Sequence, residues 1–145
     1  MTQSWKENHA LYLSVIGGLA WLVPGAGHYA LGEKRRGILI FVALFLTFMT
    51  GLYVGSIGIV DPINAKPWYV AQMMNSPAVF FLGGHVVNAQ RAADDSGNPE
   101  LAFQVYGRAG EVGQIYTSIA GLLNLLCIVN AIYMAHVQSV KETGG

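Results

Sequence analysis

Two histidines in otherwise apolar stretches are the residues of this sequence best suited to chemistry. His28 follows Gly27 and His85 follows Gly84, so each imidazole stands beside a residue that lacks a side chain. A histidine in a membrane helix can ligate haem iron or the magnesium of a chlorophyll-type tetrapyrrole, and the small neighbour leaves room for the flat macrocycle. The competing interpretation is that His28 hydrogen-bonds a carbonyl left free by Pro24 and that His85 pairs across helices. We favour hydrogen bonding, because polar residues at membrane depth usually pair with other protein groups.

Patterns typical of other site chemistries do not occur in the sequence. There is no Gly-x-Ser-x-Gly or His-Glu-x-x-His motif, and the long apolar runs contain no Asp or Glu for a proton or ion relay. The single cysteine, Cys127, can form neither an intrachain disulfide nor a cysteine-based zinc site. Eight basic and eight acidic residues cancel, so no net field attracts nucleic acid. We therefore expect no enzyme, no metal site and no nucleic-acid partner, and no cofactor other than the tetrapyrrole alternative.

Composition indicates that these histidines lie in a membrane protein. Of the 145 residues, 53% are hydrophobic and only 11% are charged, whereas about a quarter of the residues of a soluble domain are charged. Four apolar runs predict an all-α integral membrane protein, a small bundle of four transmembrane helices in a single domain, 1–145. The predicted spans are 10–31, 37–60, 68–89 and 114–137.

Prolines interrupt the first and third predicted spans. The run before Pro24 rises about 21 Å, less than the roughly 30 Å of a hydrocarbon core, so we expect a broken helix whose second piece completes the crossing. Pro77 is expected to kink span 68–89, where Gln72 and Asn75 would be costly in lipid; a re-entrant or interfacial segment is the alternative. Segment 90–113 is predicted to be a polar loop.

Small residues recur at helical spacing in the second and fourth predicted spans. Such stripes allow two helices to approach closely in lipid, which predicts a specific helix–helix interface. The alternative is that glycines are simply common in membrane helices. The stripes consist of Ala43, Thr47, Gly51 and Gly55 in one span and Thr117, Gly121 and Asn124 in the other.

A basic cluster between the first two spans predicts the orientation. Four crossings would place both termini on one side, and the cluster with loop 90–113 on the other. Because basic residues mark the cytoplasmic side, we expect the cluster inside and both termini outside, with Trp5 at headgroup depth. The same cluster would attract anionic lipid headgroups, with about 1 kcal/mol from each charge. Its members are Lys34, Arg35 and Arg36.

The turn between the first two apolar runs resembles that of a known family. Residues 24–37 read P-G-x-G-H-Y-x-L-G-x-x-x-x-G, similar to the turn of the two-helix TM2-domain family; His28, Leu31, Gly32 and Gly37 match, while Ala30 replaces the usual Tyr. Residues 111–131 are similar to the last helix of a bacterial family of four-span membrane proteins of unknown function that carries the same Pro-Gly-x-Gly-His turn. The resemblance implies a membrane fold, a bacterial inner-membrane location and no catalytic activity.

From these features we expect a non-catalytic, small polytopic membrane protein. It would be an accessory or structural subunit that packs against other transmembrane subunits of a larger complex and contacts membrane lipids. The small-residue stripes motivate this expectation. The alternative is a tetrapyrrole- or pigment-contacting membrane subunit that uses His28 or His85.

Overall fold

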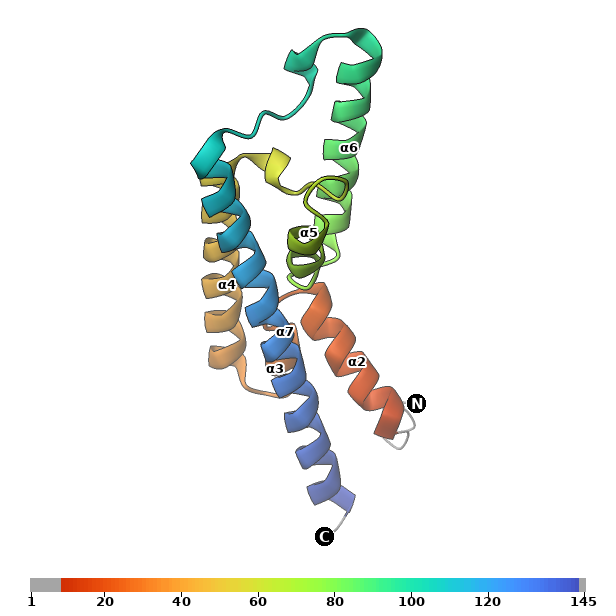
Figure 1. The fold of residues 1–145 in the computed structure, drawn as a ribbon. Coiled ribbons are helices and arrows are strands. Elements are labelled where there is room, and N and C mark those ends of the chain that lie inside the picture. The colour runs from red at the N-terminus through yellow and green to blue at the C-terminus, as the bar shows by residue number, and fades with distance from the viewer. Residues whose placement is uncertain (1–8, 144–145) are drawn as a thin grey trace.

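The computed structural model describes residues 9–143, and the expected headgroup position of Trp5 lies outside them. Within these residues the protein contains only helices and their connections, so the predicted all-α class is confirmed (Figure 1). The helices are α2 (His9–Leu22), α3 (Ala26–Ala30), α4 (Lys34–Gly55), α5 (Lys66–Met73), α6 (Ala78–Ser96) and α7 (Gly107–Thr143), with 3-10 helices η1 (Ile57–Ile59) and η2 (Pro99–Leu101).

Two long helices, α4 and α7, form the frame of the fold and run antiparallel (Figure 1). Within the described residues, α4 and the part of α7 from Gly107 to Lys141 are the helices long and apolar enough to cross a membrane. The structure therefore supports two candidate spans where we predicted four. The two remaining predicted spans, 10–31 and 68–89, are both helical hairpins.

The first hairpin consists of α2 and α3. α2 ends at Leu22, Pro24 cannot donate a helical hydrogen bond, and Gly25 takes a φ of 83°, which reverses the chain. α3 then runs back along α2, so closely that a Cβ placed on Gly27 would lie 2.8 Å from the Cβ of Ala20. The prediction that the residues after Pro24 complete a crossing is therefore wrong: the run is too short to cross, and the chain returns to the side it came from.

The second hairpin consists of α5 and α6, which meet at residues 74–77. A Cβ placed on Gly83 would lie 2.7 Å from the Tyr69 ring, and these two residues are equally distant along the chain from Ser76. The two helices are therefore antiparallel neighbours, not two parts of one kinked span. The segment is a helical hairpin because Pro77 and the polar residues before it end one helix and start another.

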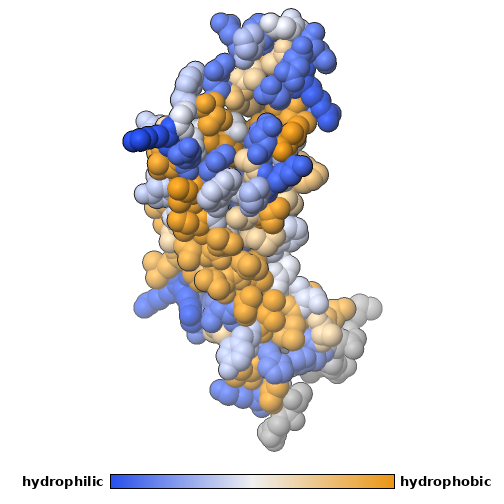
Figure 2. All heavy atoms as spheres, in the orientation of Figure 1, coloured by the Kyte–Doolittle hydropathy of each residue, from blue (hydrophilic) through white to orange (hydrophobic). Residues whose placement is uncertain are grey.

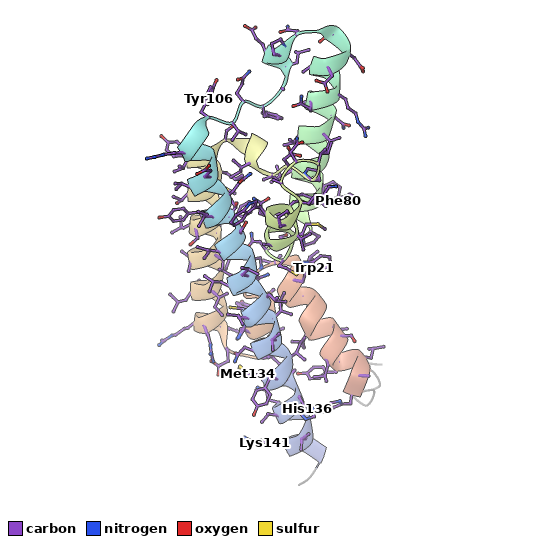
Figure 3. The ribbon with its side chains drawn as sticks, viewed as in Figure 1. Trp21, Phe80, Tyr106, Met134, His136 and Lys141 are labelled. Carbon is purple, nitrogen blue, oxygen red and sulfur yellow. The ribbon has the colours of Figure 1, made fainter. Side chains whose placement is uncertain are left out.

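The turns of the two hairpins meet in the middle of the molecule. The indole N–H of Trp21 donates to the carbonyl of Met73 at 3.0 Å, and the Ser76 hydroxyl donates to the carbonyl of Leu22 at 3.1 Å. In Figures 1 and 3 the first hairpin rises from the end of the molecule that holds both chain ends, and the second descends from the opposite end, with Trp21 between them. Each half of the chain is thus a hairpin followed by a long helix, and the halves point in opposite directions.

The basic cluster lies at the same end of the molecule as the described chain ends. An Nη atom of Arg36 lies 3.9 Å from the sulfur of Met134, and His9 and His136 are in contact at 3.0 Å. The predicted arrangement, with the cluster on one side and both termini on the other, is wrong. Each hairpin returns toward the end of the molecule from which it came, whereas α4 and α7 pass alongside both hairpins (Figure 1).

The polar connection between the third and fourth predicted spans is shorter than predicted. α6 continues to Ser96 and α7 begins at Gly107, so residues 97–106 remain of the predicted loop 90–113. Asn98 is the N-cap of η2, and its Oδ1 accepts a hydrogen bond from the N–H of Glu100 at 3.1 Å. Only this single 3-10 turn follows the cap.

Apolar side chains cover the outside of the two long helices. Only 22% of the most apolar stretch of α4 is buried, and 33% of that of α7. Figure 2 shows hydrophobic residues over the middle of the visible face, and hydrophilic residues gathered over the end that carries η2 and over the first turn of α4. Such a surface is the reverse of what the core helix of a water-soluble protein presents.

Candidate functional site

One buried asparagine joins the turns of both hairpins. Asn124, close to the middle of α7, is fully buried, and its Nδ2 donates to the carbonyls of Met74 at 3.0 Å and Asn75 at 2.9 Å. The same nitrogen lies 3.5 Å from the carbonyl of Ala20 in the first hairpin. Carbonyls at helix ends have no intrahelical donor, and in apolar surroundings each needs another partner. We call this contact region the polar junction.

Further polar contacts hold α5 against α7. Gln72 is fully buried, and its Nε2 donates to the Thr117 hydroxyl at 2.8 Å and to the carbonyl of Ile59 at 3.4 Å. Among the described residues, the side-chain oxygens of Gln72, Asn75 and Asn124 have no hydrogen-bond partner. The amides of Gln72 and Asn124 are therefore paired through nitrogen alone, and each unpartnered buried oxygen carries a desolvation cost.

The predicted stripes meet one another inside the chain. A Cβ on Gly51 would lie 2.6 Å from the Cγ2 of Thr117, a Cβ on Gly55 would lie 3.0 Å from the Cα of Gly113, and a Cβ on Gly121 would overlap the carbonyl of Ala71. The backbones of α4, α7 and α5 approach too closely for larger residues. These small residues are therefore occupied by intramolecular packing and leave no stripe for a partner at these positions.

The two remaining stripe residues have different surroundings. Ala43 is exposed, and Thr47 is half-buried with its hydroxyl donating to the carbonyl of Ala43 at 2.8 Å. The stripe on α4 thus divides in two. Gly51 and Gly55 are covered by α7, and the part that contains Ala43 borders an open groove.

Buried His28 has a half-buried partner that the sequence did not suggest. Its ring is 1% exposed, and Nε2 lies 3.0 Å from Oδ1 of Asn130 on α7, whereas no described residue pairs with Nδ1. The close approach of α3 to α7 makes the contact possible, because a Cβ on Gly27 would lie 3.0 Å from the Cβ of Ala131. We expected a carbonyl near Pro24 to be the partner. Asn124 and Asn130 are six residues apart, so they point about 120° away from each other around α7. This spacing indicates in the sequence that α7 contributes to two different sites.

An open groove lies beside this pair, between α4 and α7. The α4–α7 groove encloses about 400 Å³; its walls are aliphatic, with His28 and Asn130 at its base and Arg36 at the end nearest the chain termini. Lys34 and Arg35 lie next to Arg36 in the first turn of α4, where the N–H groups have no intrahelical acceptor. The groove is lined by His28, Arg36, Ile40, Ala43, Leu44, Leu123, Leu126, Cys127 and Asn130.

The second predicted histidine does not join the first. His85 is exposed on α6 in the second hairpin, whereas His28 lies in the first hairpin, on the other side of the polar junction. The two histidines therefore belong to different hairpins and do not form one site. Within the described residues, no three His, Cys, Asp or Glu side chains are grouped to hold a metal ion.

These features define a class of small all-helical protein in which two candidate membrane spans enclose two opposed, half-length hairpins. Comparison with known families assigns the chain more narrowly: a family model matches residues 15–143, and the protein belongs to DUF6677, a family of unknown function. The match agrees with the resemblance to an uncharacterised family, but it does not show a TM2 domain. No curated protein and no solved structure matches the chain significantly.

Proposed function

We propose that the protein is an integral membrane protein, with α4 and α7 crossing the membrane and each hairpin entering halfway. The apolar, mostly exposed surfaces of the two long helices support this location. So does the polar junction, since irregular backbone at membrane depth requires protein partners. The basic cluster favours the cytoplasmic side of a bacterial inner membrane for its end of the molecule, and the chain ends described at that end would then be cytoplasmic too.

We propose that its function is non-catalytic and consists of binding an anionic amphiphile in the α4–α7 groove. The observation that carries this proposal is the continuity of an aliphatic groove with the guanidinium of Arg36. The walls accept a hydrocarbon chain, and burial of each CH₂ contributes about 0.8 kcal/mol. The cations at the groove's end accept the headgroup.

The headgroup chemistry follows from the first turn of α4. The positive end of the helix dipole favours an anion, and Arg36 offers a planar fork for two oxygens. Lys34 and Arg35 add charge beside it. A phosphate or carboxylate headgroup with at least one apolar chain fits this arrangement, which describes an acidic membrane lipid or a fatty acid.

Native mass spectrometry of the purified chain in detergent tests this proposal with phosphatidylglycerol and phosphatidylcholine as probes. We expect preferential retention of phosphatidylglycerol, a several-fold loss in Arg36→Gln, and loss of both lipids in Ala43→Phe, which fills the groove. Arg91→Gln, which removes an exposed arginine of α6, is the control and should bind normally. Equal retention by the wild type, Arg36→Gln and Ala43→Phe would contradict the proposal.

The second candidate is an accessory subunit that packs against other transmembrane subunits. An apolar cleft of about 260 Å³ separates α4 from α6 near the junction, with Phe45, Met49 and Leu82 among its walls, and Phe80 and Phe81 stand exposed on α6. A partner helix would cover these aromatic side chains. Co-purification from native membranes in mild detergent tests this function; a single monomeric species that lacks partners in both wild type and Phe81→Ala would contradict it.

The tetrapyrrole alternative has less support. Asn130 occupies the Nε2 of His28, and His85 lies too far from it to supply a second ligand to the same macrocycle. A visible absorption band in the protein purified from native membranes, lost in His28→Leu, would revive this function.

A further inference from the structure

Two histidines at the end of the molecule are in contact and take no part in the functions above. Nδ1 of His136 lies 3.0 Å from Nε2 of His9, with ring centroids 5.0 Å apart and the rings almost perpendicular, at 83°. His9 is the first residue of α2, and His136 lies near the end of α7. In Figure 3 His136 extends from α7 toward the start of α2. The contact joins residues 127 positions apart in the chain.

We propose that this pair is a binding site for a divalent transition-metal ion, with Cu²⁺ as the preferred ion. Imidazole nitrogens bind such ions at about 2.0–2.1 Å, so two nitrogens 3.0 Å apart subtend an angle of about 90–95° at a shared ion. That angle suits neighbouring positions of a square-planar or tetragonal Cu²⁺ or Ni²⁺ site better than the wider tetrahedral angle of Zn²⁺. Cu²⁺ also binds nitrogen ligands most strongly among the divalent first-row ions.

The hydrogen-bonded state already holds the pair in a form close to the metal-bound one. A ring N–H can donate only to a neutral imidazole, so the acceptor ring presents a lone pair, the form in which histidine binds metals. The ion takes the place of the shared proton. A cationic donor ring releases that proton to solvent, whereas a neutral donor ring takes up a proton at its other nitrogen as it loses the shared one, so both rings bind as neutral imidazoles. Each ring turns by about 40° so that its lone pair points at the ion instead of along the line between the two nitrogens. His136 is exposed and His9 half-exposed, so water can fill the remaining coordination positions.

Two cations described near the pair indicate that bonds to the imidazoles, and not attraction by charge, would hold the ion. Arg36 contacts Met134, two residues before His136, and Lys141 follows one turn further along α7. These positive charges repel a metal cation that is held only by electrostatic attraction. An ion bound directly to imidazole nitrogens can overcome this repulsion. Binding would tie the start of the first hairpin to α7 and would therefore stabilise the folded chain, because the unfolded chain lacks the paired site.

Titration of the full chain with Cu²⁺ tests the proposal, with the protein purified without a polyhistidine tag. We expect one ion per chain, with two imidazole nitrogens in its electron paramagnetic resonance spectrum, and a rise in melting temperature. His9→Gln and His136→Gln should each weaken binding at least tenfold and abolish that rise. His85→Gln removes an exposed histidine that lies elsewhere and is the matched control; it should bind as the wild type does.

Three results would overturn the proposal. One is a Cu²⁺ affinity unchanged in both His9→Gln and His136→Gln. Another is an equal loss of affinity in His85→Gln. The third is a wild-type spectrum with fewer than two imidazole nitrogens, a result that decides the matter even if a variant unfolds more readily without metal.

Discussion

The two hairpins have the same design and are held in place by different interactions. Both enter the fold as a short helix, reverse at a segment that contains a proline, and reach Asn124. The first hairpin is fixed mainly by backbone proximity: a Cβ on Gly25 would overlap the carbonyl of Gly37, and one on Gly37 would lie 2.9 Å from the backbone nitrogen of Tyr29. The second also has a close backbone approach, since a Cβ on Gly121 would overlap the carbonyl of Ala71, and it adds side-chain amides and hydroxyls that reach between α5 and α7.

This difference shows two ways to stabilise a reversal inside an apolar layer. Glycine contacts let the returning helix lie directly on its neighbours, and the carbonyls of Leu22 and Ala20 also have donors from Ser76 and Asn124. The second hairpin has a longer returning helix that stands away from α4 and leaves an apolar cleft, so its turn depends on donors from α7. The first hairpin is therefore expected to tolerate no added volume, and the second no loss of donors.

The largest expected effect concerns whether both hairpins return to their own side. In a Cys127→Ala background, single cysteines at Arg35→Cys and Lys141→Cys should react with a membrane-impermeant thiol reagent from one side, and Lys66→Cys from the other. The reason is that α4 and α7 are the helices proposed to cross, as the candidate spans among the described residues. Labelling in oriented vesicles measures this all-or-none difference. If Lys66→Cys reacted from the same side as Lys141→Cys, the four-span arrangement would be right after all.

Gly25→Ala should break the first hairpin. The residue has a φ of 83° and faces the carbonyl of Gly37, so backbone strain and overlap together cost about 3 kcal/mol of unfolding free energy. Thermal unfolding in detergent measures the loss. Gly18→Ala, where a Cβ would meet nothing within 4 Å, is the control and should leave the melting temperature nearly unchanged. Equal stability of the two variants would show that close backbone approach does not hold this hairpin.

Asn124→Leu should damage both hairpins, and the second more than the first. Its shorter hydrogen bonds go to Met74 and Asn75, and leaving those buried carbonyls unpaired should cost about 2–3 kcal/mol. The unfolding free energy and hydrogen exchange of each hairpin report the loss separately. Asn88→Leu on the exposed part of α6 is the matched control. Faster exchange confined to the first hairpin would reverse the comparison.

Gln72→Leu should have the smallest effect, about 1 kcal/mol, because the substitution also removes an amide oxygen that has no partner among the described residues. Leucine fills a similar volume, and the Thr117 hydroxyl keeps its bond to the carbonyl of Gly113 at 3.0 Å. Chemical unfolding of this variant beside Asn124→Leu measures the difference. A loss as large as that of Asn124→Leu would mean that α5, not the turn, anchors the second hairpin.

The glycine and threonine spacing predicted close helix contacts, and the contact partners could not be read from it. Gly51, Gly55, Thr117 and Gly121 all lie where backbones approach, yet their neighbours belong to the same chain. Likewise the sequence marked His28 as a polar group in need of a partner, whereas only the approach of α3 to α7 identifies Asn130. A periodic pattern describes one helix face, while partners depend on the register between helices.

The sequence by itself determined that this chain is helical and apolar, that it reverses or breaks near Pro24 and Pro77, and which residues are small enough for close packing. These properties are local, since they follow from backbone sterics and side-chain volume. Only the tertiary structure decided whether each break bends a crossing helix or turns the chain back. The reason is energetic: the carbonyls at each turn accept donors from Asn124, Trp21 or Ser76, residues that meet only when both hairpins are in place.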